Sequence, residues 1–328
     1  MKMSTNSWFI KVTLGLVAAV LALPGLVPAA PKKVLVVTVT AGFRHTEGID
    51  ASEKVLPKLA EQSGAFTLDW CRQPDGKPNA PKRPSAPKPD ADEAARQKYQ
   101  TDLAKYEADN ARFKAADADY QAKLAKEMDK LSPRNLKQYD AVIFNNVSGD
   151  LSLPDMDGFL KWIESGKGFV GIHAATDTLR AKNPQHPYTL MIGAEFKTHG
   201  AQSEVEIINQ DPQHPACKHF PQTFRVFDEI YQMTRFDRRQ VHGLLTLDKH
   251  PNDKTPGDYP IAWCRLQGQG RVFYTSLGHR ADVWDDETPA GYKRQNSKEV
   301  AKACQQHLIG GIKWVLGLEP GDATPQTK

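Results

Sequence analysis

The sequence has few cysteines and lacks the short motifs that identify common hydrolases and metalloproteins. No two of its four cysteines form a C-x-x-C pair, so their spacing does not support a zinc ribbon or a c-type haem. The chain also has no G-x-S-x-G elbow and no H-E-x-x-H pair. A serine hydrolase of the α/β class and a zincin are therefore unsupported. The cysteines are Cys71, Cys217, Cys264 and Cys304.

The charge is small and forms no basic stripe. Forty-three lysines and arginines nearly balance 39 acidic residues, which leaves a net charge of +4 over 328 residues. The proline-rich stretch 77–88 holds part of the positive charge, but aromatic residues are not interleaved with it. This pattern does not favour nucleic acid as a partner.

Long apolar runs are absent outside the N-terminus. Lys2 and Lys11 precede an apolar stretch at 12–26, and small residues follow at 27–30. This order is typical of a secretory signal peptide over residues 1–30. The alternative, an uncleaved anchor, is less favoured because the stretch is short for a membrane span and contains Pro24. We therefore expect export to a bacterial periplasm, with no membrane attachment after cleavage.

Strand and helix patterns alternate through the first half of the chain. β-branched and apolar runs predict strands, and apolar spacing of three and four residues predicts helices between them. This alternation favours an α/β fold with a doubly wound, mostly parallel sheet. The predicted strands are 33–40, 66–70, 141–145 and 169–172, and the predicted helices are 49–63 and a segment after Pro154.

The second half is richer in strands and ends in a helix. A glycine-containing turn at 267–270 separates two of these strands like a hairpin. We expect one α/β domain over residues 31–319 and a flexible tail over 320–328. The predicted strands are 203–208, 224–227, 241–247, 261–266 and 271–275, followed by a helix over 297–316.

An insert of different composition interrupts this domain at residues 74–134. A proline-rich linker at 76–89 precedes a segment, 90–131, that is rich in helix-forming residues. Aromatic residues recur there every seven positions, which predicts a long helix with a narrow stripe. The helix either lies solvated on the domain or serves as an arm for a protein partner or a homo-oligomer. The stripe residues are Tyr99, Tyr106, Phe113 and Tyr120.

The stretch 168–178 holds the most informative pattern. An apolar strand ends at His173, small residues follow, and then comes Asp177. In open α/β sheets, ligands bind at the carboxyl ends of strands. Three nearby glycines match G-x-G-x-x-G but lead into the strand instead of following it, so we do not expect a nucleotide cofactor. They are Gly166, Gly168 and Gly171.

Other polar groups follow predicted strands in the same way. His45 follows the first strand, His279 follows the strand at 271–275, and Glu229 follows the strand at 224–227. If the central strands are parallel, several of these groups converge at one edge. Histidines and carboxylates together can hold a divalent metal or perform metal-free acid–base catalysis. The candidate catalytic residues are His45, His173, Asp177, His199, Glu229 and His279.

These segments resemble the ThuA-like (trehalose utilisation) family. The resemblance covers residues 33–318 apart from the insert. It implies a flavodoxin-like fold similar to class I glutamine amidotransferases, with His173 where those enzymes have their cysteine nucleophile. The matching segments are 40–45, 139–144, 168–178, 228–231, 244–248, 260–264, 270–279 and 308–317.

The resemblance also implies a role in carbohydrate catabolism through 3-keto-glycosides such as 3-keto-trehalose. We expect an exported hydrolase or lyase that uses histidine and carboxylate acid–base chemistry, with His173 or His279 as base and Glu229 or His45 as acid. A divalent metal is a candidate cofactor. The alternative is a non-catalytic carbohydrate-binding or scaffold protein that contacts a partner through residues 90–131.

Overall fold

The structure, a computed structural model, describes Met1, residues 30–180 and residues 186–326. The predicted signal peptide therefore lies outside the described residues, apart from its two end residues. From Pro31 onward the chain forms one compact unit that includes the insert. Within the described ranges, no helix has the length and apolar character needed to cross a membrane.

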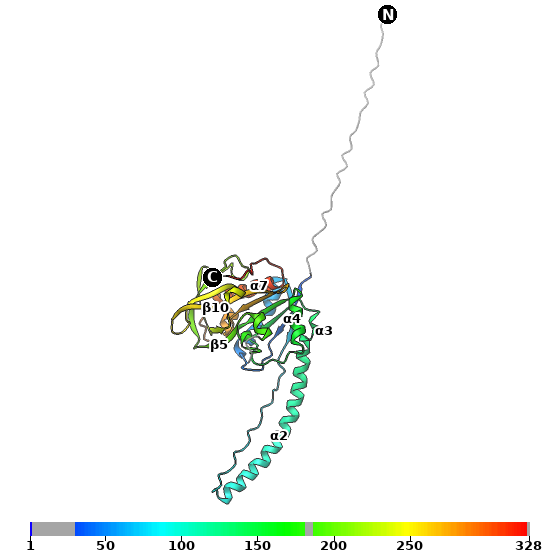
Figure 1. The fold of residues 1–328 in the computed structure, drawn as a ribbon, viewed down its shortest axis with the longest axis vertical. Coiled ribbons are helices and arrows are strands. Elements are labelled where there is room, and N and C mark those ends of the chain that lie inside the picture. The colour runs from blue at the N-terminus through cyan, green and yellow to red at the C-terminus, as the bar shows by residue number, and fades with distance from the viewer. Residues whose placement is uncertain (2–29, 181–185, 327–328) are drawn as a thin grey trace. The chain divides into compact units, whose positions relative to one another are not determined.

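The strands and helices alternate first and then give way to a run of strands (Figure 1). The strands are β1 (Lys32–Val37), β2 (Phe66–Cys71), β3 (Ala141–Asn145), β4 (Gly168–Ile172), β5 (Glu195–His199), β6 (Ser203–Asn209), β7 (Thr223–Asp228), β8 (Tyr231–Thr234), β9 (His242–Lys249), β10 (Pro256–Gln267) and β11 (Gly270–Thr275). The α-helices are α1 (Thr46–Ser63), α2 (Glu93–Met128), α3 (Pro133–Leu136), α4 (Met156–Glu164), α5 (Pro187–Ile192), α6 (Ala281–Trp284) and α7 (Lys298–Val315), and three short 3-10 helices are η1 (Asp129–Leu131), η2 (His173–Asp177) and η3 (Arg238–Gln240).

The central sheet has nine strands in the order β2-β1-β3-β4-β11-β10-β9-β6-β7. The five strands from β2 to β11 are parallel, and the rest pair antiparallel. A separate two-stranded sheet joins β5 and β8. The expected α/β fold with a mostly parallel core is confirmed. Because β1, β4 and β11 run in the same direction, their carboxyl ends meet at one edge.

Both faces of the parallel half are covered, as the continuous apolar strands predicted. Val34 and Val36 of β1 face a core that includes side chains of α1 and α7. The alternate residues, Leu35 and Val37, face a second core that includes side chains of α4 and α5. Alternation along one strand thus places the sheet between two helical layers.

The antiparallel half curls back toward the parallel half. Strand β7 lies four positions from β11, which would separate them by about 19 Å in a flat sheet. Instead, the Gly278 amide after β11 donates to Asp228 at the end of β7 over 2.8 Å. The amide of Tyr231 likewise donates to Ser276 Oγ at 3.3 Å. The curl therefore brings the chain after β7 to the edge where β1, β4 and β11 end.

The predicted insert contains a helical arm covered by its own linker. Residues at every third position of the linker are half-buried while those between them are exposed, and three residues is the period of a polyproline II helix. Tyr99, Tyr106 and Phe113 of α2 are half-buried at heptad spacing, and Tyr120 is buried. The linker residues are Pro78, Pro81, Pro84 and Pro87.

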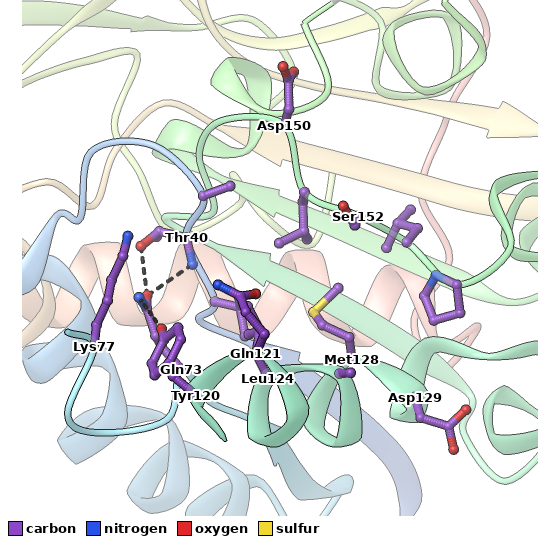
Figure 2. Close-up of a pocket in the computed structure, with 16 residues that line it drawn as sticks. Thr40, Gln73, Lys77, Tyr120, Gln121, Leu124, Met128, Asp129, Asp150 and Ser152 are labelled. Carbon is purple, nitrogen blue, oxygen red and sulfur yellow. Dashed lines mark hydrogen bonds between the residues drawn. The ribbon is translucent and has the colours of Figure 1, made fainter. Parts of the chain in front are cut away.

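Hydrogen bonds join α2 to the end of the linker and to the chain just before the linker. Arg96 donates to the Pro89 carbonyl at 3.1 Å. Figure 2 shows the other bond, in which Gln73 donates to the Tyr120 hydroxyl at 3.0 Å. These two bonds and the half-buried prolines between them hold the linker beside α2 (Figure 1). The linker therefore covers part of the aromatic stripe.

Two smaller features complete the fold. The described part of the predicted flexible tail is hydrogen-bonded to β9: His242 Nδ1 lies 2.9 Å from the Thr324 carbonyl, and Gln326 bonds both ways with the backbone of Gly243. The strands β5 and β8 were not predicted, because short polar segments carry little period-two signal. All four cysteines are buried free thiols.

Candidate active site

His173 stands at a sharp, tightly held turn directly after β4. Its φ of 49° lies in the left-handed region, which is unusual for a residue with a side chain. Its carbonyl accepts from Tyr274 Oη at 2.8 Å, and its Nδ1 lies 2.8 Å from the Ser276 carbonyl. A carbonyl can only accept, so Nδ1 carries the proton. The other ring nitrogen, Nε2, is therefore free to face the site.

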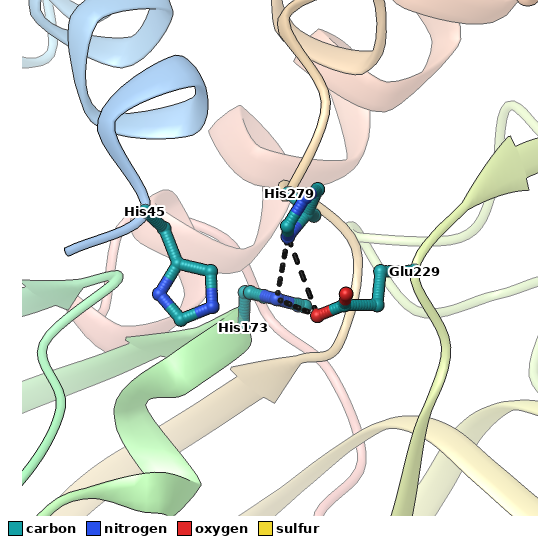
Figure 3. A group of neighbouring side chains, drawn as sticks. All are labelled: His45, His173, Glu229 and His279. Atoms are coloured by element: carbon teal, nitrogen blue, oxygen red, sulfur yellow. Dashed lines mark hydrogen bonds and ion pairs between the residues drawn. The ribbon is translucent and has the colours of Figure 1, made fainter. Parts of the chain in front are cut away.

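Two side chains converge on that nitrogen, those of Glu229 and His279 (Figure 3). His173 Nε2 lies 3.3 Å from Glu229 Oε2 and 3.3 Å from His279 Nδ1. His279 Nδ1 and Glu229 Oε2 also lie 3.3 Å apart, so the three atoms form a triangle with equal sides. We call these three residues the ligand triangle. The His173 side chain is fully buried, and those of Glu229 and His279 are 10% and 16% exposed.

The ligand triangle has too few protons to satisfy itself with hydrogen bonds. Neutral His173 offers only a lone pair at Nε2, and an ionised carboxylate only accepts. A single proton on His279 Nδ1 then serves both neighbours, and His173 faces Glu229 as acceptor to acceptor. An additional cation, either a proton or a metal ion, removes this conflict.

Electrostatics within the triangle favour a cation. Burial alone would raise the pKa of Glu229, but the neighbouring imidazoles of His173 and His279 hold it well below its ordinary value. Burial opposes protonation of His279, yet the hydrogen bond and charge of Glu229 raise the pKa of that imidazole. The carboxylate is thus ionised, and it draws positive charge toward itself.

Asp228, beside Glu229, fixes the loop that carries His279. Its buried carboxylate accepts from the amides of Gly278 at 2.8 Å and Arg280 at 3.1 Å. Burial raises the pKa of Asp228 in spite of these donors. The chain at the end of β7 therefore supplies Glu229, which faces the site, and Asp228, which positions the loop that carries His279.

His45 completes the cluster from the N-terminal end of α1. Its ring lies 4.9 Å from that of His173 and 5.3 Å from that of His279, and its Nε2 is 3.2 Å from Tyr231 Oη. Burial, followed by the nearby His173 and His279, lowers the pKa of His45 to about 3, so the ring is neutral. Suitable donor atoms of His45, His173, Glu229 and His279 all lie within 4.8 Å of one another.

His199 approaches the cluster from strand β5 and is the most open of its histidines. Its Nδ1 lies 3.2 Å from Glu229 Oε1 and 2.9 Å from the Gly200 carbonyl. The side chain is 44% exposed. A proton on Nδ1 leaves the lone pair of Nε2 available to a substrate.

Five of the six candidate residues therefore gather in one place. The sixth, Asp177, lies outside the cluster because its carboxylate pairs with Arg180 at 3.0 Å. Burial raises the pKa of Asp177. Sequence reasoning missed Tyr231, although it comes two residues after Glu229 and lies with its ring 4.1 Å from that of His173.

Comparison with known proteins places this arrangement in a family. The family model described as trehalose utilisation (ThuA) matches residues 85–315. A ThuA-like protein from Bacteroides uniformis is similar in structure, with a TM-score of 0.56, 21% identity, and coverage of 89% of this chain and 95% of the other. A ThuA-like protein from Parabacteroides merdae has a TM-score of 0.55 and 18% identity, over 87% and 90% of the two chains. Comparison with curated proteins gave no match. Because the family model covers more than half of the sequence, the chain belongs to the ThuA family, which is related to trehalose utilisation.

Proposed function

We propose that the protein is an enzyme of carbohydrate catabolism that cleaves 3-keto-glycosides, such as 3-keto-trehalose, by elimination followed by addition of water. One observation carries the proposal: three histidines and a glutamate offer donor atoms within 4.8 Å of one another at the carboxyl edge of a parallel sheet. Membership of a trehalose utilisation family supports the substrate class.

The ligand triangle fits a divalent transition metal. Ligands about 2.0–2.1 Å from a tetrahedral ion lie about 3.4 Å apart, and each side of the triangle measures 3.3 Å. Imidazole and carboxylate donors suit zinc, manganese or iron. The bond from His173 Nδ1 to the Ser276 carbonyl is the outer contact that metal-binding histidines usually make. When bound, such an ion would polarise the 3-keto group of the substrate.

His199 is the best-placed residue for proton transfer. The sequence favoured His173 or His279 as the base, but His173 is fully buried and both belong to the ligand triangle. His199 combines an exposed ring with a carboxylate at its Nδ1, which keeps Nε2 free as an acceptor. Glu229 Oε1 stabilises the imidazolium that forms.

The proposed reaction has two stages, an elimination and then an addition of water. His199 removes the proton from C2, the C2–C1 double bond forms, and the bond from C1 to the glycosidic oxygen breaks. The imidazolium returns its proton to the departing oxygen, which releases an alcohol and leaves an unsaturated ketone. Water adds to C1 while C2 regains a proton. The net reaction is hydrolysis, and no redox cofactor is consumed.

Incubation with 3-keto-trehalose in D2O tests the proposal. We expect deuterium at C2 and release of glucose, both followed by NMR, in metal-supplemented wild-type protein. His199→Ala should lose 10²-fold or more of both rates, as is typical when a general base is removed. His186→Asn, a histidine in the helix cap of α5, serves as control and should retain them. Absence of both exchange and cleavage across a panel of keto-glycosides would refute the function.

The predicted signal peptide leads us to propose an exported enzyme. The observation that supports export is the composition of residues 1–30, in which lysines precede an apolar stretch. Mass analysis of the protein recovered from the periplasm of an expressing bacterium should find a new N-terminus near residue 30. Retention of Met1 in cytoplasmic protein would contradict export.

A further inference from the structure

A cavity lies at the same edge of the sheet as the histidine cluster, at the base of the helical arm. Its volume is about 580 Å³. Its walls come from the C-terminal turns of α2, the residues just after β1, and the loop at 150–154 (Figure 2). It therefore sits beside the carboxyl ends of β1 and β3, where the strand order of the sheet reverses. Such reversal points are preferred ligand sites in open α/β sheets.

The lining of this cavity combines hydrogen-bonding groups with an apolar wall. Lys77, Gln121 and Ser152 are exposed polar side chains on its rim, while Leu124 and Met128 form an apolar strip along α2. A sugar ring has hydroxyl groups at its edge and C–H bonds on its faces. The lining suits such a ring, because its polar groups can bond the hydroxyls and so orient the sugar, while its apolar wall packs against the C–H face.

The loop after β1 connects the cavity to the histidine cluster. Ala41 lines the cavity, and His45 follows four residues later, which limits their separation to about 14 Å. The loop is held in place because the amides of Ala41 and Gly42 both donate to the Ser148 carbonyl, at 2.8 Å and 3.0 Å. Cavity and cluster are thus fixed relative to each other.

An aromatic side chain stands on this connecting loop. Phe43 is 70% exposed, and its ring centre lies 4.9 Å from that of His45. Exposing a large apolar ring brings the fold no burial energy. A ring beside a polar cluster can instead pack against the C–H face of a sugar.

We propose that the cavity binds the sugar unit remote from the reacting ring, and that Phe43 packs against the glycan between them. The substrate is then a keto-oligosaccharide longer than one ring. This inference rests on the proposed function, and it assigns the insert a role in selecting substrate length. The arm provides the wall through Gln121, Leu124 and Met128.

Filling the cavity tests the proposal. Gln121→Trp places a large ring in it, while Ala122→Trp puts the same ring at the next position of α2, an exposed residue that does not line the cavity. We compare kcat/KM for methyl 3-keto-glucoside and for maltotriose carrying a 3-keto group in its terminal ring. Gln121→Trp should lower the value for the trisaccharide about tenfold, through KM, and leave the one-ring substrate unchanged. Equal effects on both substrates, or no effect on either, would overturn the proposal.

A binding measurement separates this inference from the catalytic one. Calorimetric titration with unoxidised maltotriose needs no turnover. Weaker binding to Gln121→Trp than to Ala122→Trp supports the cavity even if no keto-glycoside is cleaved. Equal binding to both variants counts against the cavity, whatever the activity assays show.

Discussion

Zinc should stabilise the fold through the ligand triangle, and Glu229→Gln should abolish that effect. The substitution keeps the shape of the side chain but removes the one anionic ligand among His173, His279 and Glu229. Without this charge, the site no longer attracts a divalent ion to the point between His173, His279 and residue 229, whose polar atoms lie 3.3 Å apart in the wild type. Binding energy that depends on the folded site appears as folding stability, because the unfolded chain does not assemble the triangle.

The size of the effect follows from mass action. Free zinc at a thousand times its dissociation constant adds about 4.1 kcal/mol to the free energy of unfolding. The compact unit from Pro31 onward has roughly 300 residues, so its unfolding entropy is about 0.6 kcal/mol per degree. The melting temperature should therefore rise by about 6–7 °C in the wild type and by less than about 2 °C in Glu229→Gln.

Differential scanning calorimetry of chelated and zinc-loaded protein measures this shift. Asp177→Asn is the matched control, since that carboxylate lies near the cluster but pairs with Arg180. It should keep the full zinc response. The reasoning would fail if zinc, manganese and iron all leave the wild-type melting temperature unchanged, or if the control loses the response as completely as Glu229→Gln.

Three further predictions use other parts of the structure. Burial lowers the pKa of His307 to about 3, so the unfolded chain takes up its proton first as the pH falls below about 6.5. Stability should then drop by about 2–3 kcal/mol between pH 6.5 and 4.5, and urea unfolding of His307→Gln should show a weaker dependence. Gly48→Ala places a Cβ 2.4 Å from the Gly278 carbonyl; we expect lost turnover from a displaced His279 loop, and activity equal to wild type would contradict this. Phe43→Ala should weaken maltotriose binding in calorimetry while thermal unfolding stays within about 0.5 kcal/mol of wild type, because the ring is exposed; Phe43→Trp should restore binding.

The parallel half of the fold and part of the site follow from local sequence patterns. Strands β1, β4 and β11 are mostly apolar runs followed by polar residues, and parallel alignment makes their ends converge. His45, His173 and His279 could therefore be expected near one another. Each lies within eight residues of a strand end on the same edge.

The remainder depends on contacts that are distant in the sequence. Glu229 reaches the cluster only because the antiparallel half curls back, and no local pattern encodes that curvature. Asp177 follows strand β4 closely, as His173 does, but its carboxylate pairs with Arg180 instead of facing the cluster. The covering of α2 by the linker follows from neither segment alone, because a period of three in one segment and a period of seven in the other do not show that the two segments pack together.

The arm pairs a polyproline II segment with an α-helix, and the two differ in their rise per residue. One proline repeat advances about 9 Å, and one aromatic heptad advances about 10.5 Å. Lengthening the arm thus requires about three residues in the linker for every seven in α2. A deletion confined to one of the two segments would shift the prolines along α2 and would pull on Gln73, which bonds to Tyr120 of the arm and to Arg44 of the loop before His45, the latter at 3.2 Å.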